Sequence, residues 1–233
     1  MERVAGKPRP AAKPGAFKRE LARAMEGPQG PAGPRPASPR PIRLPQAAPA
    51  EAGSPFRQTI ARLESGGAGP GQGHAARNPA SGALGRYQML PVALRDIGWQ
   101  DAAGGWTALA ARHGVASEAD FLASPAAQEA AMDAFLRRAE AQLERNGSLA
   151  RAGGTVRGLD GEAVPLTEAG LVAAAHRRGA GSVARYLAHR TETPDAPLSP
   201  AQRSAFAAVE RRLRDFAAMP YALASRRAQG AAG

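Results

Sequence analysis

Cysteine is absent from this 233-residue sequence, which excludes a disulfide framework and thiolate metal ligands. Aromatic residues are also scarce, at 5%, while the apolar fraction is an ordinary 43% in which alanine is frequent. Such a composition favours closely packed helices over a sandwich or a barrel. We therefore expect a mainly α-helical domain with at most a small hairpin.

Long hydrophobic runs are missing as well. No run approaches the roughly 18 apolar residues of a membrane span. The basic start, "MERVAGKPRPAAKPG", lacks the apolar segment of about 7–15 residues that a secretory signal contains. The sequence therefore predicts no membrane span, and synthesis in the cytoplasm without a recognisable signal peptide.

Positive charge is abundant, with 31 Lys and Arg against 20 Asp and Glu and a net charge of +11. This charge predicts attraction to polyanions, whether nucleic acid, anionic lipid or an acidic bacterial cell wall. Binding of nucleic acid rests on charge alone, because the basic stretches lack interleaved aromatic side chains. Nucleic acid is thus the least favoured of these partners.

Proline divides the chain into two parts. Residues 1–55 hold twelve of the 21 prolines, and such a segment cannot bury enough apolar surface to offset the entropy of ordering it. We expect residues 1–54 to form a disordered, basic arm rich in Pro and Arg. One short helix at 16–26 is predicted inside it, either as a transient helix or as a docking helix for a partner groove.

From Ser54 onward the pattern becomes helical, and caps mark where helices begin. Helices are expected after the caps Ser54, Ser124, Thr167 and Ser199, with Gln128 and Gln202 completing capping boxes. A shorter helix is predicted in "GSVARYLAHR", and a loop or small hairpin around Asp160-Gly161 in 153–165. The predicted domain covers 55–219, and 220–233 is predicted to be a flexible tail.

Glu64 ends the first of these helices, directly before the helix-breaking stretch "SGGAGPGQG". A carboxyl group at a helix end that is shielded by apolar neighbours can have a raised pKa and act as a general acid. A solvated surface glutamate is the alternative, and Glu64 alone does not decide between the two.

Three stretches follow one another along the chain, beginning around Glu64. They are "LESGG", then "ARNPASGALGRYQMLP", then "LVAAAHRRGAGSVARYL". Their order and character resemble three blocks of the lytic transglycosylases and goose-type lysozymes, and "GRYQ" also resembles transglycosylase-type phage endolysins. The resemblance covers roughly residues 55–190 and implies a lysozyme-like α-helical domain that cleaves peptidoglycan.

The resemblance also implies site residues. Glu64 would be the catalytic acid, with Ser65 beside it. Gly85 and Gln88 would lie across the cleft, where Gln88 contacts the sugar or its N-acetyl group and Gly85 permits a positive φ or a close backbone approach. Tyr87 would supply a stacking face for a sugar ring. Other interpretations stay open: Tyr87 as a core residue, Gln88 as the cap of a turn, and the neighbouring Arg86 as a solvated charge.

A second catalytic carboxylate does not stand out. Asp96 and Asp101 follow the "GRYQ" stretch, and both have the pattern of helix-end or surface residues. One acid suffices where the N-acetyl carbonyl of the substrate stabilises the oxocarbenium-like centre. The resemblance implies this route, with Glu64 as acid and then base. The product is a 1,6-anhydro sugar if the C6 hydroxyl attacks and a reducing sugar if water attacks.

One departure from the family pattern concerns His176 and Arg177, which stand where the family has Tyr-Asn. His176 is either a replacement for that tyrosine in the cleft, titrating near neutrality, or an ordinary helix histidine. The remaining histidines, His74, His113 and His189, show no metal-ligand spacing. We expect no metal ion and no cofactor.

The sequence therefore predicts a lytic transglycosylase or muramidase acting on the MurNAc-GlcNAc β-1,4 bond at the bacterial cell wall. Delivery without a signal peptide would need a phage particle, lysis, or a secretion or flagellar apparatus, with residues 1–54 as the docking segment. The alternative hypothesis is an inactive, lysozyme-like structural or wall-binding component of such a particle or apparatus.

Overall fold

A computed structural model describes residues 54–66 and 71–223, which fall within one compact unit of the chain. These residues are mainly helical and contain two short two-stranded hairpins, so the predicted helical class is confirmed. The predicted arm at 1–54, with its short helix at 16–26, lies outside the described residues except for Ser54, and residues 224–233 lie outside them as well.

The elements follow one another in this order: α2 (Pro55–Ser65), β1 (Arg77–Asn78), β2 (Ala83–Leu84), α3 (Pro91–Asp96), α4 (Ala108–Ala111), α5 (Glu118–Ala123), α6 (Pro125–Arg145), the 3-10 helix η1 (Leu149–Arg151), β3 (Thr155–Arg157), β4 (Ala163–Pro165), α7 (Glu168–Arg178), α8 (Ala180–Glu192) and α9 (Pro200–Asp215). β1 pairs with β2, and β3 with β4, both antiparallel.

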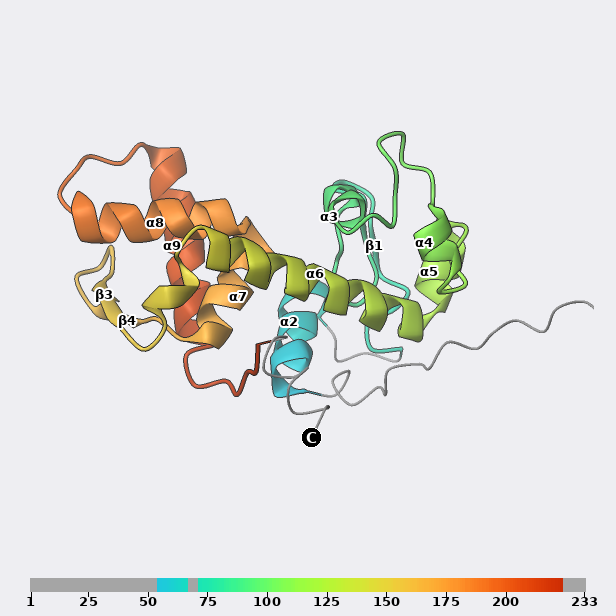
Figure 1. Cartoon of the computed structure of the whole chain (residues 1–233), viewed down its shortest axis with the longest axis horizontal. Helices are drawn as coiled ribbons and strands as arrows, with labels where there is room; N and C mark the ends of the chain where they lie inside the picture. Colours follow the sequence, from blue (N-terminus) through green and yellow to red (C-terminus); the bar gives the residue numbers. More distant parts are fainter. Residues whose placement is uncertain (1–53, 67–70, 224–233) are drawn as a thin grey trace, which may run out of the picture. The chain divides into compact units, whose positions relative to one another are not determined.

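Helix α6 is the long element that the others pack against. It runs across Figure 1, with α3 and α5 packed near its first half and α7 and α8 near its second. The helix begins where predicted, because the Ser124 side chain accepts from the backbone N–H of Ala127 and Pro125 occupies the first turn. It ends at Asn146, as predicted from the following Gly147.

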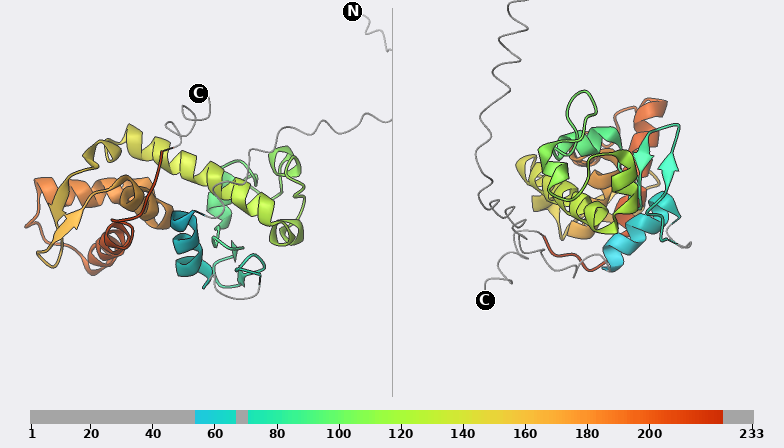
Figure 2. Two further views of the ribbon diagram at one scale, coloured as in Figure 1. Left: turned by 90° about the horizontal axis from the view of Figure 1, so that it is seen from below. Right: turned by 90° about the vertical axis from the view of Figure 1, so that its right-hand side faces the viewer.

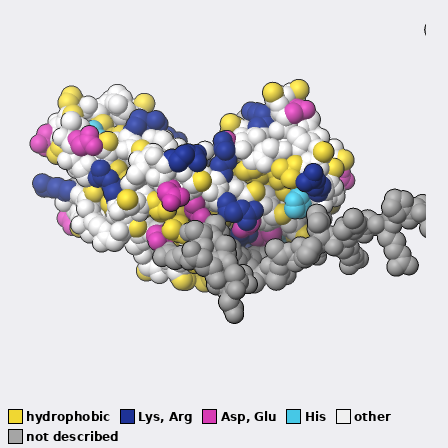
Figure 3. Space-filling model, viewed as in Figure 1, with side chains coloured by type: hydrophobic (Ala, Val, Ile, Leu, Met, Phe, Trp, Pro, Cys, Tyr) yellow, Lys and Arg dark blue, Asp and Glu magenta, His cyan; other side chains and the backbone are white. Residues whose placement is uncertain are grey.

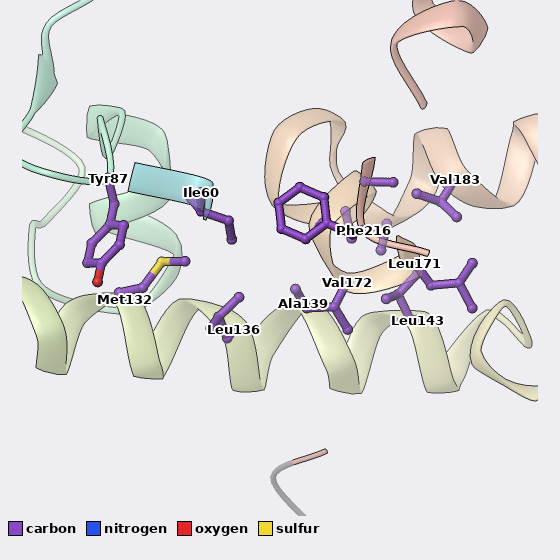
Figure 4. Packing of buried hydrophobic residues seen from close by; sticks show 14 of the residues in the cluster. Ile60, Tyr87, Met132, Leu136, Ala139, Leu143, Leu171, Val172, Val183 and Phe216 are labelled. Atoms are coloured by element: carbon purple, nitrogen blue, oxygen red, sulfur yellow. The ribbon is translucent and has the colours of Figure 1, made fainter. Parts of the chain in front are cut away.

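Helix α7 is almost fully enclosed by α6, α8 and α9. Every residue from Ala169 to Ala175 is buried, and Figure 4 shows Leu171 and Val172 meeting Ala139 and Leu143 of α6. Such close approach depends on small side chains. At Gly170 an added Cβ would lie 2.9 Å from the backbone oxygen of Leu213 in α9.

Helix α2 is held by one apolar and one charged contact. Its Phe56 ring packs at 5.2 Å from the Phe216 ring, just past α9. On its other side, the buried Arg57 pairs with Glu129 and Asp133 of α6, each at 3.0 Å. Seen from below in Figure 2, α2 accordingly lies between the β1–β2 hairpin and α9.

The domain extends further than the predicted boundary at 219. The Tyr221 ring lies 4.4 Å from that of Phe56, and its hydroxyl bonds the carboxylate of Glu140. Met219, Tyr221 and Leu223 all pack against the core. The prediction that the flexible tail begins at Pro220 is therefore wrong for 220–223.

The other predictions of local structure have mixed outcomes. The capping box of Ser199 and Gln202 is confirmed, and so is the hairpin in 153–165. Helices α3, α4 and α5 and the β1–β2 hairpin were not predicted. Within the described ranges, no helix combines the length and the hydropathy needed to cross a membrane.

Candidate functional site

The "GRYQ" stretch forms a tight turn between Leu84 and Met89. The backbones of these two residues exchange hydrogen bonds of 3.0 and 2.9 Å. Gly85 has φ +71°, which confirms the predicted positive φ, and Gln88 adopts the left-handed region as well, with φ 47°. The backbone and the side-chain amide of Gln88 both donate to the Gly85 carbonyl, at 3.1 and 3.0 Å. Gln88 thus closes the turn, one of the interpretations left open.

A buried glutamine of α6 holds this turn in place. The Gln128 side chain is 1% exposed, and its Oε1 accepts from the backbone N–H of Arg86 at 2.8 Å. Its Nε2 donates to the carbonyls of His74 and Phe121 at 3.0 and 2.9 Å. The predicted capping role of Gln128 is therefore wrong, because its amide is fully used in connecting three segments.

Gly85 is required at the turn for a second reason. A Cβ at this position would lie 2.3 Å from Oε1 of Gln128, so the close backbone approach predicted here is to a protein side chain. Gly85 itself does not line the cleft. Its contribution is to fix the backbone that presents Gln88.

Tyr87 and Arg86 point into the protein. The Tyr87 side chain is 1% exposed and its hydroxyl donates to Glu129 at 2.6 Å, which leaves no ring face for a sugar. Burial and the bond to Glu129 raise the pKa of this hydroxyl well above its usual value. Arg86 is buried too, bonded to the Gln72 carbonyl and side chain. The stacking role of Tyr87 and the solvated Arg86 are thus both wrong predictions.

Ser65 has a structural contact instead of a place in the cleft. Its hydroxyl donates to the Ala61 carbonyl at 3.0 Å, one turn back along α2. An added Cβ at Gly73 would lie 2.3 Å from this hydroxyl, so the chain after the break passes close to the helix end. This contact positions the end of α2 and therefore Glu64.

A cleft of about 830 Å³ brings together three of the six predicted site residues, namely Glu64, Gln88 and His176. Its walls come from the end of α2, the "GRYQ" turn and α3 on one side and from the α7–α8 junction on the other. Figure 3 shows a notch between these two parts, with Arg side chains beside it. Ser65, Gly85 and Tyr87 do not line it.

The Glu64 carboxylate faces two guanidinium groups. Its Oε1 accepts from Nη2 of Arg212 at 2.5 Å, and its Oε2 from Nη1 of Arg177 at 3.5 Å. The side chains of Glu64 and Arg212 are 9% and 11% exposed, whereas that of Arg177 is 55% exposed. The prediction of an apolar shield around Glu64 is therefore wrong. One close, enclosed ion pair and one loose, exposed pair surround the carboxylate.

Burial lowers the pKa of the Arg212 guanidinium, and the nearby Glu64 carboxylate opposes that effect. The two enclosed side chains therefore form one ion pair. Removing either charge leaves the other enclosed with a weaker partner, which costs stability.

His176 lines the cleft as a neutral imidazole. Burial lowers its pKa from 6.5 to about 3, and the positive charges of Arg212 and Arg177 act in the same direction. Its ring meets that of Phe135 edge-on at 5.5 Å. The prediction that His176 titrates near neutrality is wrong, since the ring stays uncharged there and offers one donor and one acceptor.

The two aspartates considered as partners for Glu64 differ in position. Asp96 lines the same cleft and forms an ion pair with Arg138 of α6. Asp101 accepts from the backbone N–H groups of Ala103 and Gly105, so it caps its own loop.

The three histidines outside the cleft have other contacts. His74 bonds Gln128, His113 stacks on Trp99 at 4.8 Å, and His189 bonds the Ala196 carbonyl. In the part of the chain that the structure describes, no group of three or more His, Asp or Glu side chains is arranged to hold a metal ion.

Arg212 is the contact of Glu64 that sequence reasoning missed. A signal was present, because Arg212 follows Val209 by three residues and precedes Phe216 by four. Both neighbours are fully buried. A charge at such a position of a helix marks an enclosed ion pair or a site.

Comparison with protein families, with curated proteins and with solved structures found no match. The cleft brings together a carboxylate between two arginines, a neutral histidine and a turn glutamine.

Proposed function

We propose that this protein cleaves the β-1,4 bond between N-acetylmuramic acid and N-acetylglucosamine in peptidoglycan, within a lysozyme-like helical domain and with Glu64 as the single general acid and base. The observation that carries the proposal is the meeting of Glu64, Gln88 and His176 in one cleft. They come from the three separate stretches whose order resembles the lytic transglycosylases and goose-type lysozymes. This convergence supports a common role for the three stretches.

The cleft has groups suited to an N-acetylated sugar. The Gln88 Nε2 is occupied by the Gly85 carbonyl, which leaves its Oε1 to accept from the N–H of an acetamido group. The neutral His176 can donate to or accept from a hydroxyl without adding charge. A volume of about 830 Å³ lies within the range of clefts that enclose most of a small ligand.

In the proposed reaction, protonated Glu64 gives its proton to the glycosidic oxygen as the bond to C1 of the muramic sugar breaks. The acetamido carbonyl of the substrate stabilises the positive charge that develops at C1. Glu64, now a carboxylate, takes a proton from the C6 hydroxyl or from water as that oxygen attacks C1. The 1,6-anhydro product and the reducing product differ only in this last step.

Arg212 sets a condition on this chemistry. Its Nη2 already donates to Oε1 of Glu64 at 2.5 Å. Entry of substrate has to loosen this contact before that oxygen can meet the glycosidic oxygen.

The test is digestion of purified peptidoglycan by the wild type and by Glu64→Gln, with mass spectrometry of the released fragments. The wild type should release fragments, and the variant should lose at least about a hundredfold in rate, the usual scale for a general acid. Fragments lighter by one water would identify a lytic transglycosylase. Reducing ends would identify a muramidase.

Glu144→Gln is the matched control, because Glu144 is an exposed residue of α6 outside the cleft. It should cleave as the wild type does. Melting curves of both variants are needed, since Glu64→Gln also weakens the pair with Arg212. A folded Glu64→Gln protein with normal activity would overturn the assignment.

A second candidate is a lysozyme-like protein that binds the wall without cleaving it, as a structural component of a phage-like particle or export apparatus. The two arginines on Glu64 favour it, because both carboxylate oxygens already have contacts that a substrate would have to displace. Sedimentation of the folded protein with sacculi, without release of fragments, would support this candidate. In both cases we propose action at the cell wall, with residues 1–54 as a docking segment for delivery.

A further inference from the structure

We propose that the cleft also contains an anion subsite, formed by Arg177 and Arg178 at the end of α7, that binds a carboxylate of the peptide attached to the muramic sugar. Leu63, Leu90 and Val92 would contact the methyl groups of that peptide. The identity of the ligand rests on the proposed function, whereas the subsite itself rests on the charged and apolar side chains that line the cleft.

Positive charge is in excess around the cleft. Among the described residues, four charged side chains line it: Glu64, Asp96, Arg177 and Arg178. The two carboxylates have close partners outside its lining, since Glu64 pairs with Arg212 and Asp96 with Arg138. Arg177 is thus left with only a loose contact to Glu64, and Arg178 with no acid.

The two arginines are free to take a ligand. Arg178 is exposed and makes no ion pair or side-chain hydrogen bond within residues 54–66 and 71–223. Arg177 has only the loose contact of 3.5 Å with Glu64, and its side chain is 55% exposed. Guanidinium groups bind carboxylates through paired, charge-assisted hydrogen bonds, so two adjacent arginines provide a strong match for this group.

Basic residues in the last turn of a helix also stabilise the helix dipole, which is the simplest alternative explanation. That explanation is independent of the cleft. It predicts that Arg178 affects stability and leaves ligand binding unchanged, so binding measurements separate the two.

Apolar side chains gather in the same cleft. Four large hydrophobic side chains are exposed in the described part of the chain, and three of them, Leu63, Leu90 and Val92, line the cleft. Val92 is the most exposed, at 59%. Exposed apolar side chains that cluster in one cleft mark a surface that a ligand covers.

The occupant must therefore carry both a negative charge and apolar groups. A strand of N-acetylglucosamine alone has no charge to pair with Arg177 and Arg178. The peptide of peptidoglycan has alanine methyl groups close to free carboxylates, so it matches both features. Charge complementarity thus favours the peptide-bearing sugar over an uncharged strand.

The test is a binding measurement, by calorimetry, with three soluble probes. They are a muramic disaccharide that carries its peptide, the same compound with its carboxyl groups amidated, and a disaccharide of N-acetylglucosamine, which has neither lactyl group nor peptide. The wild type should bind the first probe about five-fold more tightly than the other two, the scale of one partly exposed charge-assisted contact. This preference should weaken with added salt.

Arg178→Gln should remove the preference among the three probes. Arg203→Gln is the matched control, because Arg203 is an exposed arginine of α9 outside the cleft and should behave as the wild type. Equal binding of the amidated and free peptide probes by the wild type would overturn the proposal. Retention of the preference by Arg178→Gln, or no binding of any probe by the wild type, would also overturn it.

Binding keeps this proposal separate from the proposed catalysis. A preference that depends on Arg178, found together with no cleavage of sacculi, would uphold the subsite and reject the enzyme. Cleavage that depends on Glu64, found together with equal binding of all three probes, would uphold the enzyme and reject the subsite.

Discussion

The two walls of the cleft are built in different ways. The wall at the α7–α8 junction belongs to helices whose small and aliphatic side chains pack closely against α6 and α9. The wall from Asn78 to Asp96 consists of short elements and turns, held by buried hydrogen bonds such as those of Gln128. Close apolar packing fixes one wall through shape, and directional polar contacts fix the other. We call the wall at the α7–α8 junction the helical wall and the wall from Asn78 to Asp96 the turn wall. A substitution that disturbs apolar packing should destabilise the helical wall, and one that removes a buried hydrogen bond should destabilise the turn wall.

Gln128→Leu should have the largest effect. The leucine fills a similar volume but leaves the buried Arg86 N–H and the His74 carbonyl without their Gln128 partner. We expect a loss of about 3 kcal/mol in the free energy of unfolding, from two or more unsatisfied groups. Urea unfolding measures it, and hydrogen exchange of the Arg86 amide should accelerate.

The control for this change is Gln142→Leu, on the same helix but without a comparable set of hydrogen bonds in the described residues. It should change stability by less than about 0.5 kcal/mol. If both leucine variants were equally stable, directional contacts would not be what holds the turn wall.

Gly170→Ala tests the helical wall and should have the next largest effect. The new methyl group would lie 2.9 Å from the Leu213 backbone oxygen, so α7 and α9 have to move apart. We expect a loss of about 2 kcal/mol, typical of overpacking in a dense core. Thermal and urea unfolding measure it.

Gly181→Ala is the matched change in α8, because its Cβ would meet only the flexible end of Arg185 at 3.6 Å. It should be neutral or stabilise by up to about 1 kcal/mol, since alanine favours helix more than glycine does. Equal losses in the two variants would show that contact with α9 is not the cause.

The smallest expected effect is the pH dependence due to His176. The unfolded histidine takes up a proton near pH 6.5, whereas burial lowers the native pKa to about 3. Its contribution to stability is therefore complete above about pH 6.5 and is lost as the pH falls. Between pH 7 and 5.5 we expect a loss of about 1 kcal/mol beyond that of His176→Gln. Identical pH profiles for the two proteins would contradict the neutral buried ring.

The helical wall was largely predictable from sequence, and the turn wall was not. The caps Ser124, Thr167 and Ser199 are local signals, and each starts a helix where predicted. The "GRYQ" turn instead depends on Gln128, which lies 42 residues from Arg86 in sequence. Local patterns carry no information about such a partner.

The site shows the same limit. Glu64, Gln88 and His176 were predicted from resemblance and share a cleft. The burial of Tyr87 was not predictable, because an aromatic side chain serves equally well in a core or under a sugar. The pairing of Glu64 with Arg212 was missed for a similar reason, since no local pattern indicates which distant side chain approaches a helix end.

The ion pair between Glu64 and Arg212 joins the first and the last helices described, 148 residues apart in sequence. During synthesis, α2 therefore emerges long before the arginine that will accompany its glutamate. Until α9 docks, Glu64 lacks its enclosed partner and the cleft lacks part of its surroundings. A nascent, truncated or proteolysed chain that lacks α9 would thus lack Arg212 and have no complete site. The Glu64–Arg212 pair can form only when the last helix has docked.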